Sequence, residues 1–533
     1  MQRAFERIDH FVVQHMSENA TPGLALAVTS RDGLLHVATY GFADLKARRP
    51  LTPDTLFEIG SISKSFTAIA LLQLREEGKF DPQAPVTRYL PWFEIQTKFE
   101  PTTGHHLLSH SAGIPRDRDD VYFSRYAVYA LRQRQTGYAP GTKYAYSNIG
   151  YQMLGTILME IEKQPHAEIL RRRIFDRVGM KSSDPVISFE THKRLAIGYI
   201  PLYDDRPAHS SHPLVEAPKF EYYAGDGSVA ATPADLAAYL RMLLNRGAAP
   251  NGRVLNEESF ALLIQPVVKM DEKNFYGYGL WSREEDGHRI IGHSGGMVGY
   301  AAQLLGDLDV GIGVVVFVNG PGSPGRVAEF ALQAARAALK GTELPPLPEP
   351  DSSTRVENAA DYAGTYTAPN GKTLTFEAAG DQLSLLHKGE RIALERRGKD
   401  AFYLAHPAFE HPLLRFGRDK DGRVVEATHG SDWYAGEGYT GPRAFPLPSA
   451  WQAYPGHYRL MNPWSSNIRV VLRKGKLWLV AGASEEELVE LEPGLFQVGT
   501  EPTAERLRFD AVVEGKALRA NLSGLDFYRT LIP

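Results

Sequence analysis

Two hydrophobic patterns alternate over the first 340 residues of the chain. Near the N-terminus, apolar residues recur every three or four positions with charged residues between them (Phe5, Ile8, Phe11 and Val12). This spacing predicts an amphipathic helix, whereas a signal peptide would have an uninterrupted apolar core. The apolar run over residues 310–318 predicts a buried strand. Together these signals predict a domain of helices and strands over residues 1–340.

The pattern changes after residue 340. Residues 341–353 read GTELPPLPEPDSS, a polar stretch stiffened by four prolines, and we assign residues 341–356 as a linker. Beyond it, short alternating stretches broken by Gly, Asp-Gly and Lys-Gly turns predict antiparallel strands.

An internal repeat divides this second part. Tyr362-Ala-Gly-Thr-Tyr366 recurs 92 residues later as Tyr454-Pro-Gly-His-Tyr458, and Arg415-Phe416 recurs 93 residues later as Arg508-Phe509. We therefore predict two homologous β-domains over residues 357–444 and 451–533, joined by a second linker over 445–450. A small antiparallel barrel would hide the sheet edges of each domain; two small β-sandwiches are the alternative.

Composition narrows the possible functions. The chain has 533 residues, 59 basic and 63 acidic side chains, a net charge of −4 and no cysteine. A thiol nucleophile, a disulfide framework and a cysteine-ligated metal are excluded. The balanced charge gives no sign of a nucleic-acid or membrane partner, and no window is apolar enough for a membrane-spanning helix. We expect a cytoplasmic protein, or a periplasmic or secreted one if a signal peptide has been removed.

The first candidate for chemistry is Ser61-Ile-Ser-Lys64, at the start of a predicted buried helix within 57–80. Residues three apart lie on one helical face, so Lys64 is placed to take the proton of the Ser61 hydroxyl. The alternative is structural, with Ser61 as a helix N-cap and Lys64 exposed to solvent.

Two further motifs follow along the chain. Tyr146-Ser-Asn148 precedes an apolar helical stretch, and its phenol and amide are suited to proton transfer and carbonyl binding; Asn148 as an N-cap is the alternative. Gly292-His-Ser-Gly-Gly296 fits the nucleophile-elbow pattern, which needs a helix directly after the serine. The glycines and the buried strand that follow argue against an elbow and place His293 at a strand start.

Taken together, Ser-x-x-Lys, Tyr-x-Asn and His-x-Gly resemble the three motifs of serine β-lactamases and penicillin-binding peptidases. The segments 106–114 (HLLSHSAGI) and 224–235 (AGDGSVAATPAD) are also similar to that family. The resemblance implies an α/β (α+β) catalytic domain with a central antiparallel sheet flanked by helices.

The resemblance also implies a role for each motif residue. Ser61 would be the acylated nucleophile, Lys64 its base and Tyr146 the proton relay. Asn148, His293 and Gly295 would contact the substrate, and the backbone N–H groups of Ser61 and Gly296 would form the oxyanion hole.

The third motif bears on the substrate. The family commonly has lysine where this chain has His293, and a neutral histidine binds a substrate carboxylate less well than a lysine does. D-Aminopeptidases of the family resemble this chain in that histidine and in two C-terminal barrels. The resemblance implies release of an N-terminal residue from peptides or amino-acid amides, often with a preference for D-residues. A family VIII-type esterase with weak β-lactamase activity and a non-catalytic binding protein are the alternatives.

We expect neither a cofactor nor a metal. The histidines at 105, 106, 110, 209 and 212 do not follow a zinc-protease spacing. We expect Ser484-Glu-Glu-Glu487 to be a solvated loop, and we expect the partners to be small peptide, amide or ester substrates and a second copy of the chain in a homodimer or larger homo-oligomer.

Overall fold

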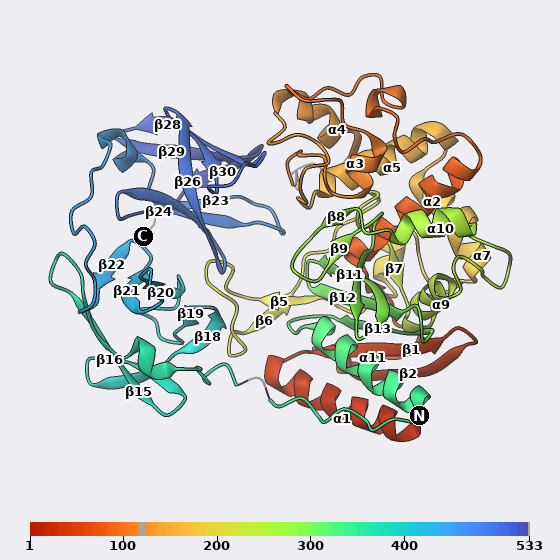
Figure 1. Ribbon diagram of the computed structural model, residues 1–533, viewed down its shortest axis with the longest axis horizontal. Coiled ribbons are helices and arrows are strands. Elements are labelled where there is room, and N and C mark those ends of the chain that lie inside the picture. The colour runs from red at the N-terminus through yellow and green to blue at the C-terminus, as the bar shows by residue number, and fades with distance from the viewer. Residues whose placement is uncertain (117–123, 351, 531–533) are drawn as a thin grey trace. The chain divides into compact units, whose positions relative to one another are not determined.

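The computed structural model describes residues 1–116, 124–350 and 352–530 (Figure 1). The chain forms two compact units. The first contains Met1–Ile200 and Leu214–Pro350, and the second contains Pro201–Pro213 together with the residues after Pro350. Among the described residues, no helix is both long and apolar enough to cross a membrane.

The first unit is built on a nine-stranded antiparallel sheet with strand order β3-β2-β1-β13-β12-β11-β10-β9-β8. Its strands are β1 (Gly23–Ser30), β2 (Leu34–Asp44), β3 (Arg49–Pro50), β8 (Val268–Lys269), β9 (Phe275–Tyr276), β10 (Trp281–Glu285), β11 (His288–Met297), β12 (Tyr300–Asp307) and β13 (Ile312–Val318). Small pairs join β4 (Phe57–Glu58) to β7 (Ala230–Ala231), and β5 (Tyr199–Pro201) to β6 (Leu214–Glu216). The predicted buried strand is β13, which is buried along its whole length.

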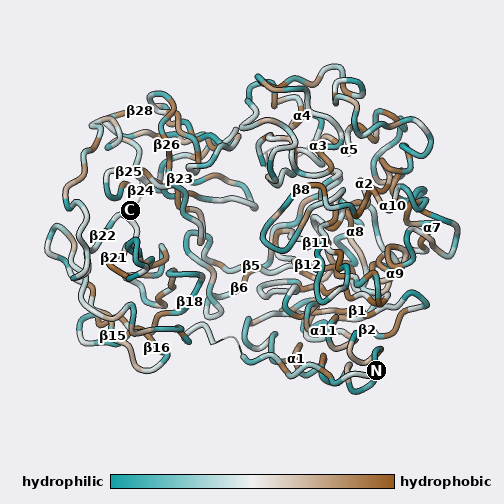
Figure 2. The backbone as a smooth tube through the Cα atoms, in the orientation of Figure 1, coloured by the Kyte–Doolittle hydropathy of each residue, from teal (hydrophilic) through white to brown (hydrophobic). Residues whose placement is uncertain are grey.

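Helices cover both faces of this sheet because its central strands are apolar on both sides. Alternate residues of β13 belong to different cores: Val314 and Val316 pack in the cluster of α1 and α11, whereas Val315 and Phe317 pack in the cluster of α2 and α9. Figure 1 shows α1 and α11 on one face, and Figure 2 shows hydrophobic residues gathered along the sheet and its helices. The predicted antiparallel sheet flanked by helices is confirmed.

The longer helices of the first unit are α1 (Gln2–Asn19), α2 (Ser63–Glu76), α5 (Asn148–Glu162), α9 (Pro233–Leu244), α10 (Glu257–Ile264) and α11 (Pro324–Lys340). The shorter turns are η1 (Gly60–Ile62), η2 (Val86–Arg88), α3 (Gly104–Leu108), α4 (Ser124–Tyr129), η3 (Ala130–Gln133), α6 (His166–Leu170), the π-helix η4 (Arg171–Phe175), α7 (Asp176–Val178) and α8 (Phe189–His192). The predicted N-terminal amphipathic helix is α1, whose apolar face is buried.

The second unit holds the two β-domains. The first is a nine-stranded sheet, order β17-β16-β15-β14-β22-β21-β20-β19-β18, that curls without closing. It comprises η5 (Ala359–Tyr362), β14 (Gly364–Thr367), β15 (Thr373–Ala379), β16 (Gln382–His387), β17 (Glu390–Ala393), β18 (Glu395–Gly398), β19 (Ala401–Tyr403), β20 (Leu414–Arg418), β21 (Val424–His429) and β22 (Asp432–Ala435).

The second β-domain is a closed eight-stranded barrel. It comprises η6 (Ser449–Ala453), β23 (Gly456–Arg459), β24 (Asn467–Arg473), β25 (Lys476–Ala481), β26 (Ser484–Glu492), β27 (Leu495–Val498), β28 (Arg506–Val513), β29 (Lys516–Leu522) and β30 (Leu525–Arg529). The predicted barrels are therefore confirmed, one closed and one nearly closed. Residues 484–487, predicted to form a loop, instead begin β26.

The repeated tyrosines form equivalent hydrogen bonds in the two β-domains. The phenol of Tyr366 donates to the carbonyl of Tyr362 at 3.1 Å, and the phenol of Tyr458 donates to the carbonyl of Tyr454 at 2.6 Å. In each case the bond ties the first strand back to the short turn before it. The sequence repeat thus corresponds to a repeated hydrogen bond at the start of each domain.

One segment of the first 340 residues belongs to the second unit. Residues Pro201–Pro213 pack with the β-domains: Arg206 is paired with Glu410, and His209 lies 3.0 Å from Glu395 and stacks on the ring of Tyr403. Each unit therefore contains two separate stretches of the chain. The predicted boundary at residue 340 treats residues 201–213 as part of the first domain and does not account for this arrangement.

Candidate active site

Ser61 lies in the short turn η1, directly before α2. The turn passes close to β11: a Cβ on Gly60 would lie 2.5 Å from the carbonyl oxygen of Gly296 and 2.7 Å from its nitrogen. Gly60 also has a φ of 50°, which glycine adopts without steric cost. The α2 cap position is Ile62 and has no side-chain cap bond. The alternative interpretation of Ser61 as an N-cap is therefore wrong.

The ammonium group of Lys64 lies at the centre of the site, with no exposed surface. It donates to the hydroxyl of Ser61 at 2.9 Å, to the amide oxygen of Asn148 at 2.7 Å and to the carbonyl of Asp226 at 3.0 Å. A lysine ammonium has three N–H donors, and three acceptors surround this one. Lys64 is therefore buried and directed at Ser61, in contrast to the alternative of a solvated side chain.

Tyr146 also contacts Ser61. Its phenol donates to the Ser61 hydroxyl at 2.6 Å, and the Lys64 nitrogen lies 4.8 Å from its ring centre. The ring of His110 lies against the same phenol, with a centroid separation of 4.3 Å. The Ser61 oxygen is therefore within proton-transfer distance of two groups, the buried amine of Lys64 and the phenol of Tyr146.

The start of α5 brings Asn148 to Lys64. Ser147, not Asn148, is the N-cap: its hydroxyl accepts from the backbone N–H of Gly150 at 3.1 Å and donates to the carbonyl of Pro115 at 2.7 Å. The alternative of Asn148 as the cap is therefore wrong. With the cap supplied by its neighbour, the Asn148 amide is directed at the lysine.

His293 lies on β11, on the sheet face that carries α2. In β11 every second residue shares a face, and a Cβ on Gly295 would lie 1.9 Å from the carbonyl oxygen of Ile59. His293 therefore faces the same side as Ser61. Burial and the charge of Lys64 lower the pKa of His293 to about 3, so the ring is neutral at physiological pH.

The structure adds functional neighbours that the motifs did not identify. Asp226 gives Lys64 its third acceptor and binds the phenol of Tyr222 through its carboxylate. Tyr276 bonds the ring of His293 at 2.8 Å. Asp226 and His110 lie in segments quoted for the family resemblance, which is a signal for them; Tyr276 has no such signal.

The chain is similar to known proteins in sequence and in fold. The beta-lactamase family model matches residues 8–339. The chain belongs to the beta-lactamase family. This family of serine hydrolases includes penicillin-binding relatives, so the predicted family is confirmed.

Several named relatives span most of their own length in the match. Penicillin-binding protein 4* of Bacillus subtilis (strain 168) is 27% identical over 413 residues, covering 72% of this chain and 87% of the relative. Penicillin-binding protein 4 of Amycolatopsis lactamdurans is 29% identical over 382 residues, covering 67% and 95%. The octameric penicillin-binding protein homologue from Pyrococcus abyssi superposes with a TM-score of 0.60 and 26% identity, covering 81% of this chain and 99% of that one.

Other polar features of this beta-lactamase family member lie apart from Ser61. In the described part of the chain, His288, Asp307 and Asp309 bring three ligand atoms within 4.8 Å of one another. The protein's own cations already approach them, since Arg336 Nε lies 2.8 Å from Asp307 and Lys340 Nζ lies 2.8 Å from His288. These residues are therefore better described as an ion-pair cluster than as a metal site.

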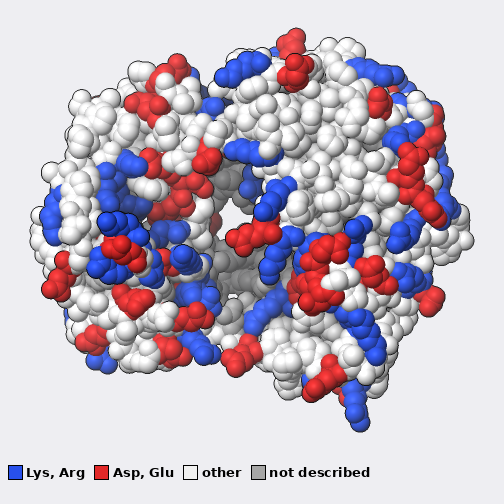
Figure 3. Space-filling view, viewed as in Figure 1, with Lys and Arg blue, Asp and Glu red and all other residues white. Residues whose placement is uncertain are grey.

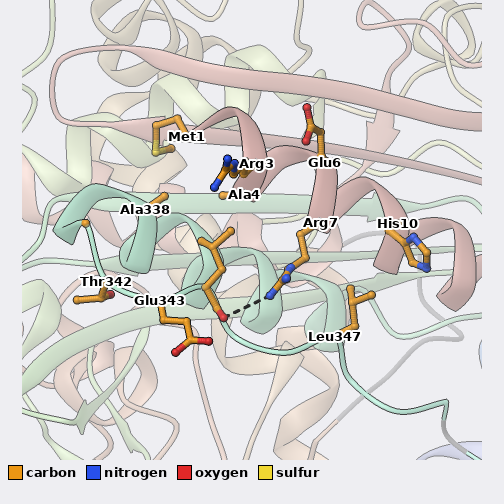
Figure 4. Close-up of a pocket in the computed structure, with 12 residues that line it drawn as sticks. Met1, Arg3, Ala4, Glu6, Arg7, His10, Ala338, Thr342, Glu343 and Leu347 are labelled. Carbon is orange, nitrogen blue, oxygen red and sulfur yellow. Dashed lines mark hydrogen bonds between the residues drawn. The ribbon is translucent and has the colours of Figure 1, made fainter.

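The hollow in Figure 4 is also not the catalytic site. It encloses about 770 Å³ between α1 and the chain that follows α11, and Arg7 donates to the carbonyl of Leu344 across it. Figure 3 shows acidic and basic side chains interspersed over the visible face of the molecule, in line with the balanced composition.

Proposed function

We propose that the protein is a serine hydrolase that forms an acyl-enzyme on Ser61. One observation carries this proposal: the Ser61 hydroxyl is contacted by Lys64 at 2.9 Å and by Tyr146 at 2.6 Å. A serine hydroxyl becomes nucleophilic when an adjacent group removes its proton, and here two candidate groups are in direct contact with it.

The acylation step follows from this arrangement. Once its ammonium group has released one proton, Lys64 takes the Ser61 proton as the serine oxygen bonds to the substrate carbonyl carbon. The carbonyl electrons move to the oxygen, giving a tetrahedral oxyanion. As this collapses, the bond to the leaving group breaks, and Tyr146 gives its proton to the departing nitrogen or oxygen while recovering one from Lys64. In deacylation, water bonds to the acyl carbon and gives one proton to Tyr146, which passes its own proton to Lys64. The ester bond to Ser61 then breaks, Lys64 returns a proton to the serine oxygen, and the acid is released.

The oxyanion is assigned to the backbone N–H groups of Ser61 and Gly296. Support comes from the close approach of Gly296 to Gly60, the residue before Ser61. The space where a Gly296 Cβ would stand is empty to 4 Å, which leaves room for a substrate. Each oxyanion donor typically contributes about 10²–10³ in rate.

For the substrate we propose peptides or amino-acid amides from which an N-terminal residue, including a D-residue, is released. The uncharged His293 supports this assignment, because a substrate carboxylate would meet no cation from the third motif. The family VIII-type esterase is the runner-up. The octameric homologue from Pyrococcus abyssi supports a homo-oligomeric assembly of this chain as a further proposal.

Covalent labelling tests the nucleophile. Incubation with a fluorophosphonate or a β-lactam should add one reagent mass to a peptide that contains Ser61, and Ser61→Ala should abolish the adduct. Ser294→Ala is the matched control, because Ser294 is the serine of the rival elbow motif and is exposed. An adduct that persists in Ser61→Ala and is lost in Ser294→Ala would overturn the assignment.

A substrate panel tests the reaction class. D- and L-aminoacyl p-nitroanilides should be cleaved, and p-nitrophenyl esters serve as the comparison. Rapid ester turnover without any anilide cleavage would replace the aminopeptidase proposal with the esterase. A Ser61 adduct without turnover of either class would point to a binding protein.

A further inference from the structure

His293 has a hydrogen-bond partner on a strand two positions away in the sheet. The phenol of Tyr276, on β9, lies 2.8 Å from Nε2 of His293, on β11. On the other side of the ring, Nδ1 lies 2.5 Å from the carbonyl oxygen of Ser294. Both side chains are buried, with 4% of His293 and 1% of Tyr276 exposed. Each ring nitrogen of His293 is therefore engaged within the protein.

These partners determine the tautomer. A carbonyl oxygen only accepts hydrogen bonds, so Nδ1 carries the proton that bonds Ser294. In the neutral ring, Nε2 is then the acceptor, and the Tyr276 phenol is its donor. His293 thus has no N–H to offer a substrate.

Tyr276 also reaches the proton relay through its ring. Its ring centre lies 4.7 Å from that of His110, and His110 lies 4.3 Å from Tyr146. The N–H of Ser147 donates to Nδ1 of His110 at 3.1 Å, which holds that ring in place. One tyrosine therefore bonds the third motif with its hydroxyl and packs toward the second motif with its ring.

We infer that Tyr276 is a positioning residue that holds His293 as the neutral Nδ1–H tautomer and so excludes a carboxylate from the third-motif side of the substrate. This inference rests on the proposed function, because it specifies which substrates the Ser61 site accepts. A protonated His293 would present a cation where related enzymes have lysine. The Tyr276 donor opposes that state, since an Nε2 that accepts from a phenol has no proton of its own.

The groups around His293 oppose the same protonation. Lys64 faces it from α2, and its charge would repel a positive charge on the ring. His110 faces it from the segment after α3, and burial and the charge of Lys64 lower the pKa of His110 well below its usual value. Gln303, on β12, donates to the backbone carbonyl of His293 at 3.2 Å. Among the residues that the structure describes, the groups that shift the pKa of His293 include no acidic side chain. Removing the Tyr276 hydroxyl takes away the donor at Nε2 and leaves that nitrogen free to bind a proton.

The test compares Tyr276→Phe with Tyr278→Phe. Tyr278 is the matched control: it is equally buried, lies two residues away, and bonds His105 at 2.7 Å rather than His293. In the intact protein, the ring-nitrogen NMR shifts of His293, assigned by loss of the signal in His293→Asn, should show the Nδ1–H tautomer. Tyr276→Phe should raise the pKa of His293 and add an acid-side inflection to the pH profile of kcat/KM.

The substrate readout uses a dipeptide and its C-terminal amide. The intact protein should cleave the amide faster than the dipeptide. In Tyr276→Phe, the ratio of the amide rate to the dipeptide rate should fall about tenfold at acid pH, where His293 becomes cationic. Tyr278→Phe should leave both the tautomer and the preference unchanged. A purely structural role would lower both rates equally without a new inflection.

The NMR result separates the two proposals. An Nε2–H tautomer or a cationic ring in the intact protein at neutral pH would overturn the inference even if the enzyme is active. Absence of activity with the expected tautomer would instead overturn the proposed substrate class. An unchanged dipeptide-to-amide ratio in Tyr276→Phe would also contradict the inference.

Discussion

At the residue scale, the proposed catalytic role of Lys64 depends on its hydrogen-bond acceptors. Lys64 is fully buried, and it donates to the amide oxygen of Asn148 at 2.7 Å. Asn148→Ala leaves that donor without its amide partner. A hydrogen bond to a charged group contributes about 1.5–3 kcal/mol, so kcat/KM should fall roughly 10- to 150-fold.

Ser147→Ala is the control for this change. It removes the cap of the same helix and should lower the free energy of unfolding by about 1 kcal/mol. It leaves the Asn148 amide in place, so its effect on kcat/KM should be smaller. Equal rate losses in the two variants would mean that the helix position, rather than the amide, accounts for the effect.

A second prediction concerns Glu58, whose buried carboxyl lies three residues before Ser61. Burial raises the pKa of Glu58 from 4.5 to about 8. Between these values the unfolded chain has released the proton and the folded protein retains it, so the free energy of unfolding falls as the pH rises. Glu58→Gln keeps the shape and removes the titration. Relative to the intact protein, it should gain stability from pH 5 to pH 8.5, by up to about 4 kcal/mol.

Urea unfolding at several pH values checks this prediction. Glu77→Gln is a useful contrast, because hydrogen bonds from Arg173 lower the pKa of that carboxyl to about 2, and its removal should not produce a relative gain at alkaline pH. A stability difference between Glu58→Gln and the intact protein that does not vary with pH would contradict the assigned burial effect.

The residues that motifs identify and those that only the fold identifies differ in kind. Ser61, Lys64, Tyr146 and Asn148 carry local patterns, and the structure joins them by hydrogen bonds. The Tyr276 contact depends on the pairing of β9, β10 and β11, and the burial of His293 depends on the helices above it. Neither the pairing of these strands nor the burial of His293 could be predicted from the local sequence pattern. The tautomer of His293 could therefore be assigned only from the structure.

At the scale of elements, the contact of η1 with β11 sets the shape of the site. A Cβ on Gly295 would lie 1.9 Å from the carbonyl oxygen of Ile59, whereas a Cβ on Gly296 would meet nothing within 4 Å. Gly295→Ala should therefore push β11 away from the turn that carries Ser61. We expect a lower melting temperature and a loss of kcat/KM of at least about 10²-fold, the cost of one misplaced oxyanion donor.

Gly296→Ala is the matched control for stability, since it adds the same methyl group on the same strand. Its melting temperature should stay near that of the intact protein, as measured by thermal unfolding. If both variants melt at the same temperature, the close approach of η1 to β11 does not determine the stability of the protein.

The wrong prediction at this scale has an electrostatic explanation. Residues 484–487 looked like a solvated loop because three of them are acidic, yet they begin β26. Glu485 is nearly buried and is paired with Arg473 at 2.7 Å, and Glu487 is paired with Lys476 at 2.7 Å. The Lys476–Glu487 pair joins the neighbouring strands β25 and β26, and the Arg473–Glu485 pair spans from β24 to β26. These ion pairs replace the apolar alternation that strand prediction relies on.

At the scale of the whole molecule, the exchanged segment Pro201–Pro213 changes how the domains can be separated. Continuous patterns predicted the boundary at residue 340. They could not show that a polar loop packs with the β-domains through Glu395 and Glu410, which lie 186 and 204 residues after their partners in the chain. A chain cut after Pro350 would strip this segment of the partners that bury Arg206 and His209. Deletion of the β-domains therefore needs a simultaneous replacement of residues 201–213.

The Arg206–Glu410 pair provides the test of that packing. The side chains are 14% and 22% exposed, so solvent screens them less than it does a surface pair. A double-mutant cycle with Arg206→Ala and Glu410→Ala, followed by urea unfolding, should give a coupling energy of about 1–2 kcal/mol. The matched control is Arg423 with Asp419, a pair in the same unit whose arginine is 72% exposed and whose coupling should be at most about 0.5 kcal/mol. Equal coupling in the two cycles would mean that residues 201–213 lie on the β-domains without being held by this ion pair.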